Sequence, residues 1–213
     1  AVSAGLQTVA GAGGSTDIEW AIDSGMMPDG MSAYIAYSPR PDGGKATDKT
    51  GTGVGSKVSG HGYDIVLEHS GLYDGLNVFA GYSMIEQATS TAISGDRTAV
   101  AAGATYAMGG FTIGYQYSKD NLEGNDSKTN YYENDAFGVS FNVNDDLSIS
   151  FGSHKSERNM LGATNVELEA QSAQIAYTMG GASVKIADTD VDNANYSANT
   201  DRSGTTVALS LAF

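Results

Sequence analysis

The sequence predicts an all-β chain whose antiparallel strands form a transmembrane β-barrel. Three observations support this fold class. Apolar and polar residues alternate along most of the chain, which is the side-chain period of a β-strand. The links between the alternating segments are short and long in turn, and the polar side of each segment consists mainly of small, uncharged residues. These features indicate strands that cross a membrane with one side toward lipid and the other toward water.

Alternation places the individual strands. Phe137, Val139 and Phe141, for example, are separated by small residues such as Gly138 and Ser140. The pattern predicts about eleven strands, near residues 18–23, 31–38, 63–69, 76–84, 98–108, 111–118, 136–143, 147–154, 173–179, 182–188 and 204–213. A sheet of this width either closes on itself or splits into two packed sheets.

The connections favour closure in a membrane. Short links are expected near residues 24–29, 70–74, 108–110, 144–146 and 179–181, where they form tight hairpins. Longer polar links are expected at residues 39–59, 87–95, 120–134, 156–166 and 189–204. A barrel inserted in an outer membrane has short turns on its inner side and long loops on its outer side. A soluble β-sandwich does not require all its short links at one end and all its long links at the other.

Composition excludes several classes of protein. The chain of 213 residues has 25 acidic and 11 basic side chains, a net charge of −14, and no Cys. Such an acidic chain repels nucleic acid, so we expect no nucleic-acid partner. Without Cys there is no disulfide framework, thiolate nucleophile or thiolate zinc site. No run approaches the roughly 20 apolar residues that a membrane-spanning helix requires.

The C-terminal residues 204–213 alternate in polarity and end on an aromatic side chain, which resembles the C-terminal assembly signal of outer-membrane β-barrels. Residues 177–188, with a Gly-Gly turn before an Asn- and Asp-rich stretch, resemble the last hairpin of alphaproteobacterial general diffusion porins. Residues 106–115 have the same character. The resemblance implies a Gram-negative outer-membrane location, with lipid and lipopolysaccharide as surroundings. It further implies a homotrimer of identical subunits, for which the small residues 99–104 offer one contact patch.

Strand parity bears on completeness. The last strand must end on the short-turn side, so counting back eleven strands places the start of the first, near Asp17, on the long-loop side. An even-stranded bacterial barrel cannot begin there, and we expect at least one strand upstream. The resemblance implies a 16-stranded porin barrel, with residues 1–16 as the tail of the constriction loop and residues 17–213 as barrel strands. The alternatives are a flexible outer loop at residues 1–16 and a complete 12-stranded barrel.

Polar residues on the small-residue side of the strands are candidates for a channel wall, because charge there sets the ion selectivity of a pore. The candidates are Asp17, Glu19, Asp23, Asp64, Glu68, Arg97, Gln116, His154 and Lys185. Acidic residues outnumber basic ones in this set. A negative lumen concentrates cations within a Debye length of about 8 Å, which predicts a weak cation preference.

One stretch rich in side-chain oxygens is a candidate metal site. Asp188, Asp190 and Asp192, followed by Asn193 and Asn195, could hold Ca²⁺ weakly in an outer loop. The spacing departs from that of an EF-hand, which has Gly at its sixth position and Glu at its twelfth. A solvated loop, bridged to lipopolysaccharide by divalent cations, is the alternative, and no other cofactor is expected.

Catalytic signatures are weak. Of His61, His69 and His154, only His154 lies on the polar side of a predicted strand, where a polar wall residue is the expected role. Residues 51–57 are rich in Gly but lack the Walker spacing of a phosphate-binding loop. We therefore expect no enzyme but a passive diffusion channel for small hydrophilic solutes and ions. A translocation barrel of about twelve strands, a barrel enzyme and a secreted β-rich adhesin are the competing classes.

Overall fold

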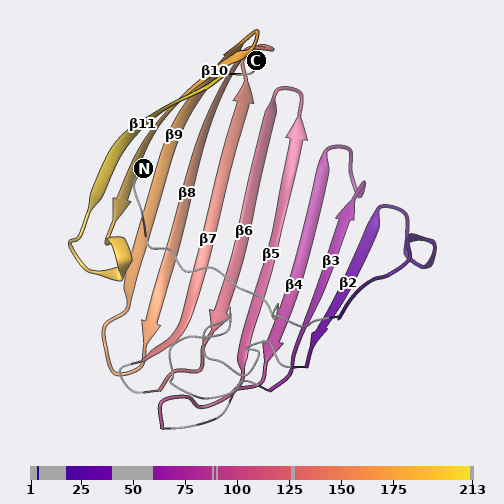
Figure 1. Cartoon of the computed structure of the whole chain (residues 1–213), viewed down its shortest axis with the longest axis vertical. Coiled ribbons are helices and arrows are strands. Elements are labelled where there is room, and N and C mark those ends of the chain that lie inside the picture. The colour runs from indigo at the N-terminus through magenta and orange to yellow at the C-terminus, as the bar shows by residue number, and fades with distance from the viewer. Residues whose placement is uncertain are drawn as a thin grey trace.

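A computed structural model describes residues 4, 18–39, 60–87, 89, 91–125 and 128–211. Within these ranges eleven strands form one antiparallel sheet, in which each strand pairs with its neighbours in sequence (Figure 1). The strands are β1 (Ile18–Ala21), β2 (Met31–Ser38), β3 (Gly62–Ser70), β4 (Leu76–Ile85), β5 (Arg97–Met108), β6 (Phe111–Asn121), β7 (Thr129–Asn142), β8 (Leu147–Met160), β9 (Val166–Met179), β10 (Ala182–Asp192) and β11 (Arg202–Leu211). The all-β antiparallel fold with eleven strands is confirmed.

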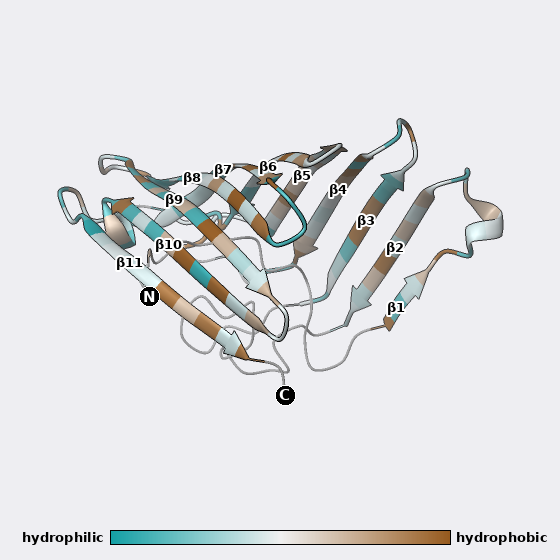
Figure 2. Ribbon diagram, turned by 90° about the horizontal axis from the view of Figure 1, so that it is seen from above, coloured by the Kyte–Doolittle hydropathy of each residue, from teal (hydrophilic) through white to brown (hydrophobic). Residues whose placement is uncertain are grey.

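The sheet curls into an arc whose open edges are β1 and β11 (Figure 2). Two short 3₁₀ helices, η1 (Ser24–Met26) and η2 (Ala194–Tyr196), lie in the links of the first and last strand pairs. None of the helices in the described ranges is long and apolar enough to cross a membrane.

The register assigns each side chain to a face, because directly opposed residues on paired strands point the same way. Tyr115 lies opposite Ala104 and Phe137, whereas Gln116 lies opposite Gly103 and Ala136. We call the face of Tyr115 the outer face and the face of Gln116 the inner face. The large apolar side chains of the outer face are exposed: Ile113, Tyr115, Phe137 and Ile175 each keep more than two fifths of their surface accessible. Such a face needs an apolar environment.

Short links meet at one end of the sheet, as predicted (Figure 1). Two residues, Gly109 and Gly110, connect β5 to β6, and Gly180 and Gly181 connect β9 to β10. Gly109 and Gly180 both have φ of +57°. That left-handed conformation suits the two-residue hairpin turns that match the twist of the flanking strands, and Gly adopts it without a Cβ penalty.

The opposite end differs from the prediction. Residues 120–134 and 156–166 were expected to be loops, but β7 begins at Thr129 and β8 continues to Met160. The link between β8 and β9 is only the five residues 161–165, and β10 runs on to Asp192. The predicted link at residues 39–59 lies outside the described residues apart from Pro39.

Strand length explains this error. Fourteen residues, the length of β7, β8 and β9, extend about 46 Å, or about 35 Å of height at a tilt near 40°. The apolar band of a membrane barrel is only about 25 Å tall. Beyond that band both faces of a strand meet water, so the apolar alternation that marks a strand in the sequence disappears while the hydrogen-bonded ladder continues.

Candidate functional site

The inner face is a wall of small side chains. Gly114, Gly138 and Gly152 lie directly opposite one another on β6, β7 and β8. Ala136, Ser140 and Ser150 extend the same low surface, which forms part of a hollow of about 460 Å³. A second hollow of about 270 Å³ lies over β3, β4 and β5. The small-residue parity identified in the sequence therefore forms an inner surface that contains two hollows.

Six of the predicted wall residues lie on this inner face. Glu19 of β1 and Asp64 of β3 both oppose Ala36 of β2, so they share its face. Glu68, Gln116, His154 and Lys185 occupy inner positions on β3, β6, β8 and β10. Parity alone was sufficient to place these side chains, because each falls inside an alternating segment.

Two predicted acidic residues do not join them. Asp17 lies outside the described residues. Asp23 follows the end of β1, where its Oδ1 accepts a hydrogen bond of 2.7 Å from the backbone N–H of Gly25. Asp23 caps η1 in a short turn, and its prediction as a strand wall residue was wrong because β1 stops at Ala21.

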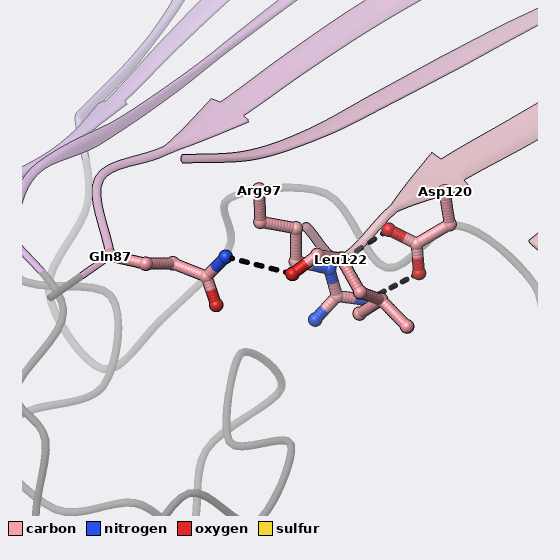
Figure 3. Close-up of polar contacts among 4 residues, drawn as sticks. All are labelled: Gln87, Arg97, Asp120 and Leu122. Carbon is pink, nitrogen blue, oxygen red and sulfur yellow. Dashed lines mark hydrogen bonds and ion pairs between the residues drawn. The ribbon is translucent and has the colours of Figure 1, made fainter. Parts of the chain in front are cut away.

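Arg97 lies on the inner face, but its charge is buried and paired. Its Nε donates to Asp120 Oδ1 at 2.9 Å and its Nη2 donates to Asp120 Oδ2 at 2.5 Å (Figure 3). Arg97 is 6% exposed and Asp120 is 3% exposed. The two charges cancel at the loop end of β5 and β6, so Arg97 contributes little to the field that a solute meets. The alternation pattern did not indicate this pairing, because Asp120 was expected to begin a loop.

The ion pair lies where two links are held together. Gln87 Nε2 donates to the carbonyl oxygen of Leu122 at 3.4 Å (Figure 3). The same nitrogen also donates to the carbonyl oxygen of Gly95, in its own link, at 3.4 Å. Ser94 Oγ donates to Glu123 Oε2 at 2.8 Å. The link between β4 and β5 is thus fastened to the link between β6 and β7.

Arg158 is a wall residue that sequence reasoning missed. It opposes Tyr132 of β7 on the inner face, and its Nη2 donates to the carbonyl oxygen of Tyr196 at 2.9 Å. The guanidinium also lies 5.5 Å from the centre of the Tyr196 ring. The signal was present, because Arg158 continues the parity of His154, but the predicted strand ended too early.

Tyr196 anchors the last link on the inner face. Its ring joins a buried cluster with Leu168, Val191 and Ala194, and its hydroxyl lies 2.7 Å from Ser156 Oγ. Beside this cluster, the N–H of Asn195 donates to the carbonyl oxygen of Ala4 at 2.9 Å. The described part of the N-terminal segment is thus attached to the link between β10 and β11.

Charge is segregated on the inner face. Leaving aside the Arg97–Asp120 pair, the described strands carry acidic residues on β1 and β3 and basic residues on β8, β10 and β11. The acidic residues are Glu19, Asp64 and Glu68, and the basic residues are Arg158, Lys185 and Arg202. These strands lie on opposite sides of the arc (Figure 2). The predicted excess of acidic over basic wall residues is absent from the described strands, although a transverse field remains.

Among the described residues, the hydrogen-bond contact of His154 is with the side chain of Asn134. Its Nε2 lies 3.5 Å from Oδ1 of Asn134, at the limit of a hydrogen bond. An amide oxygen can orient an imidazole, but nucleophilic catalysis requires a hydroxyl or thiol within reach of the ring. The contact therefore fits a polar wall residue better than a catalytic base.

The proposed calcium ligands are arranged differently from the expectation. Asp188, Asp190 and Asp192 lie within β10 on the outer face, not in a loop. Successive carboxylates in this series are two residues apart along the strand, which places them about 7 Å from each other. Asp188 Oδ1 accepts a hydrogen bond of 2.7 Å from Thr205. In the described ranges no three His, Cys, Asp or Glu side chains are grouped closely enough to hold a metal ion.

Ion pairs cover the outer face above its apolar band. Lys119 Nζ lies 3.3 Å from Glu133, and Lys155 Nζ lies 3.4 Å from Glu169 and 3.8 Å from Glu167. Below them the outer face is apolar, with the rings of Phe111 and Phe141 stacked at 4.2 Å between centroids. The change from apolar to charged marks a boundary between two environments along β6 to β9.

Known proteins share this architecture. A protein-family model described as Gram-negative porin matches residues 2–178. An anion-selective porin from Comamonas acidovorans is similar in structure, with a TM-score of 0.70 and 13% identity over 96% of this chain and 63% of the other. OmpF of Salmonella typhi, solved with daunomycin, has a TM-score of 0.68 and 15% identity over 91% and 61% of the two chains.

OmpT of Vibrio cholerae is a third similar structure, with a TM-score of 0.60 and 10% identity over 91% of this chain and 62% of the other. At such identities these likenesses show the fold. The chain spans less than two thirds of the length of each of these three structures. The search of curated proteins found no match.

Proposed function

The chain belongs to the Gram-negative porin family and to the bacterial outer membrane, and we propose that its sheet walls a channel for passive diffusion of small hydrophilic solutes and ions. The contrast between its two faces carries the proposal. The outer face exposes large apolar side chains, whereas the inner face is lined mainly by small residues such as Gly, Ala, Ser and Thr. Small polar groups suit a wall wetted by water, and no chemical step or cofactor is involved.

The proposed channel is part of a 16-stranded barrel. A barrel of about eight strands is filled by its own side chains, whereas one of sixteen leaves an aqueous passage. The open edges of β1 and β11, and the larger size of the similar porins, support further strands. Residues 1–16 are proposed as the tail of the constriction loop, although only Ala4 among them is described.

We propose a weak cation preference. The inner faces of the described strands carry three exposed or half-exposed charges of each sign, so these strands favour neither ion. The net charge of −14 supports the preference, because an acidic chain attracts cations. The similarity to an anion-selective porin is one of fold at 13% identity and does not set the sign for this chain.

A homotrimer is proposed for the assembly. The expected contact patch at residues 99–104 is divided by the strand period, so that only Val100, Ala102 and Ala104 lie on the outer face. Together with Ala80 of β4, opposite Ala102, they form a low apolar surface suited to close contact between subunits.

Lipid surrounds the remaining apolar band of the outer face. The ion pairs above this band would meet lipopolysaccharide headgroups, where divalent cations could bridge to Asp188, Asp190 and Asp192.

Liposome swelling tests the proposed diffusion. Vesicles containing the purified protein should swell in isotonic sugar solutions at rates that fall as sugar size increases. Equal swelling with and without protein would contradict the proposal.

A further inference from the structure

We infer that Phe79 and Glu68 form a subsite for organic cations on the inner wall. The two residues lie directly opposite each other on β4 and β3. Opposed side chains of an antiparallel pair have Cβ atoms about 5 Å apart. An aromatic ring and a carboxylate therefore adjoin on a wall otherwise composed mainly of small neutral residues. This inference deepens the proposed channel function and rests on it.

Phe79 lies against the inner wall, over a glycine that leaves room for its ring. It opposes Gly103 of β5, and its Cε1 lies 2.6 Å from the point that a Cβ at residue 103 would occupy. No other residue type fits beneath the ring without displacing it. The ring therefore leans across β5 along the wall and lies over the backbone of Gly103.

Both hollows of the inner wall border this ring. Phe79 lines the hollow of about 270 Å³ together with Asp64, Gly81 and Ser83. It also lines the hollow of about 460 Å³ together with Thr105 and Gln116. Because Phe79 lines both hollows, a solute in either hollow can contact it.

Glu68 supplies the charge. It is exposed on the inner face, and the ion pairs found among the described residues do not include it. Arg97, a basic residue on the neighbouring part of the wall, is already bound to Asp120. A carboxylate without a protein cation beside it attracts a cation from solution.

The combination selects a class of solute. A ring face attracts ammonium and guanidinium groups through its quadrupole. A small metal ion would prefer several oxygen ligands, and an anion would be repelled by Glu68. An organic cation satisfies the ring and the carboxylate together, and its apolar body fits the methylene and methyl surface of the hollows.

Single-channel recording in planar bilayers tests the subsite with choline as the probe. Choline should reduce the open-channel current in a saturable manner, whereas 3,3-dimethyl-1-butanol, its neutral isostere, should not. Phe79→Leu should weaken the apparent affinity for choline about fivefold, and Glu68→Gln about three- to tenfold at low salt. Phe79→Trp keeps an aromatic face and should retain the affinity of the parent protein.

Matched controls make the same changes on the outer face. Phe137→Leu and Glu167→Gln should leave choline block unchanged. Equal block by the neutral isostere, or unchanged affinity in both Phe79→Leu and Glu68→Gln, would overturn the subsite. These outcomes presuppose open channels, so they differ from a protein that opens none, which would instead refute the proposed function.

Discussion

Arg97 on β5 and Asp120 on β6 form a bidentate ion pair that is almost completely buried on the inner face. The pair lies beside the hydrogen bond from Gln87 to Leu122, which joins the link after β4 to the link after β6 (Figure 3). A buried charge that loses its partner is far less stable than a neutral pair of similar volume. Arg97 and Asp120 therefore each require the other charge to be stable in this buried position.

Arg97→Met should destabilise the folded barrel by about 3–5 kcal/mol, because Asp120 would remain buried without its counter-ion. Urea unfolding of the detergent-solubilised protein measures this change. The double variant Arg97→Met/Asp120→Leu removes both charges and should recover most of the loss. If the double variant were less stable than Arg97→Met, the dependence between the two charges would be disproved.

Gly103→Ala should be destabilising by about 1–3 kcal/mol, since the new methyl group would meet Phe79 Cε1 at 2.6 Å and the carbonyl oxygen of Tyr115 at 2.8 Å. Gly138→Ala is the matched control on the same wall. Its methyl group would find its nearest neighbour, Phe151 O, at 3.9 Å. Heat-modifiable mobility in gels compares the two, and equal stability of both variants would be inconsistent with the close packing at Gly103.

Gly138→Phe should lower single-channel conductance while leaving the protein folded. The side chain would project from the inner wall into a hollow, where it would displace water from the conducting path. Val139→Phe places the same ring on the outer face of the same strand and should conduct like the parent protein. A conductance loss in Val139→Phe but not in Gly138→Phe would reverse the assignment of the two faces.

Lys185→Glu should increase cation preference. Lys185 is an exposed inner-face base on β10, and the change shifts the wall by two negative charges. The reversal potential in a KCl gradient measures the shift, which should diminish as the salt concentration rises. Lys155→Gln on the outer face should have little effect. A shift toward anion preference in Lys185→Glu would contradict its position on the conducting wall.

The sequence allowed accurate prediction where a strand separates two different environments. Phe137, Val139 and Phe141 alternate with small residues because lipid and water lie on opposite sides, and the inner positions of Gln116 and His154 followed. The prediction failed for Arg158, because Glu157, Arg158 and Asn159 are polar on both faces. Strand and loop look alike in sequence once water lies on both sides.

The alternation pattern also could not identify contacts between side chains on neighbouring strands. Parity assigned Arg97 to the inner face but could not show that Asp120, 23 residues later, neutralises it. Likewise, nothing local to Phe79 indicates that Gly103 lies beneath its ring. Register between neighbouring strands decides both contacts, and register depends on the length of every intervening turn and strand.

Single-channel conductance of the purified protein in planar lipid bilayers tests whether the inner face walls an aqueous channel. We expect discrete, long-lived openings whose conductance rises nearly in proportion to the conductivity of the KCl solution, as for a wide aqueous path. Correctly folded, membrane-inserted protein that gives no conductance steps would contradict it.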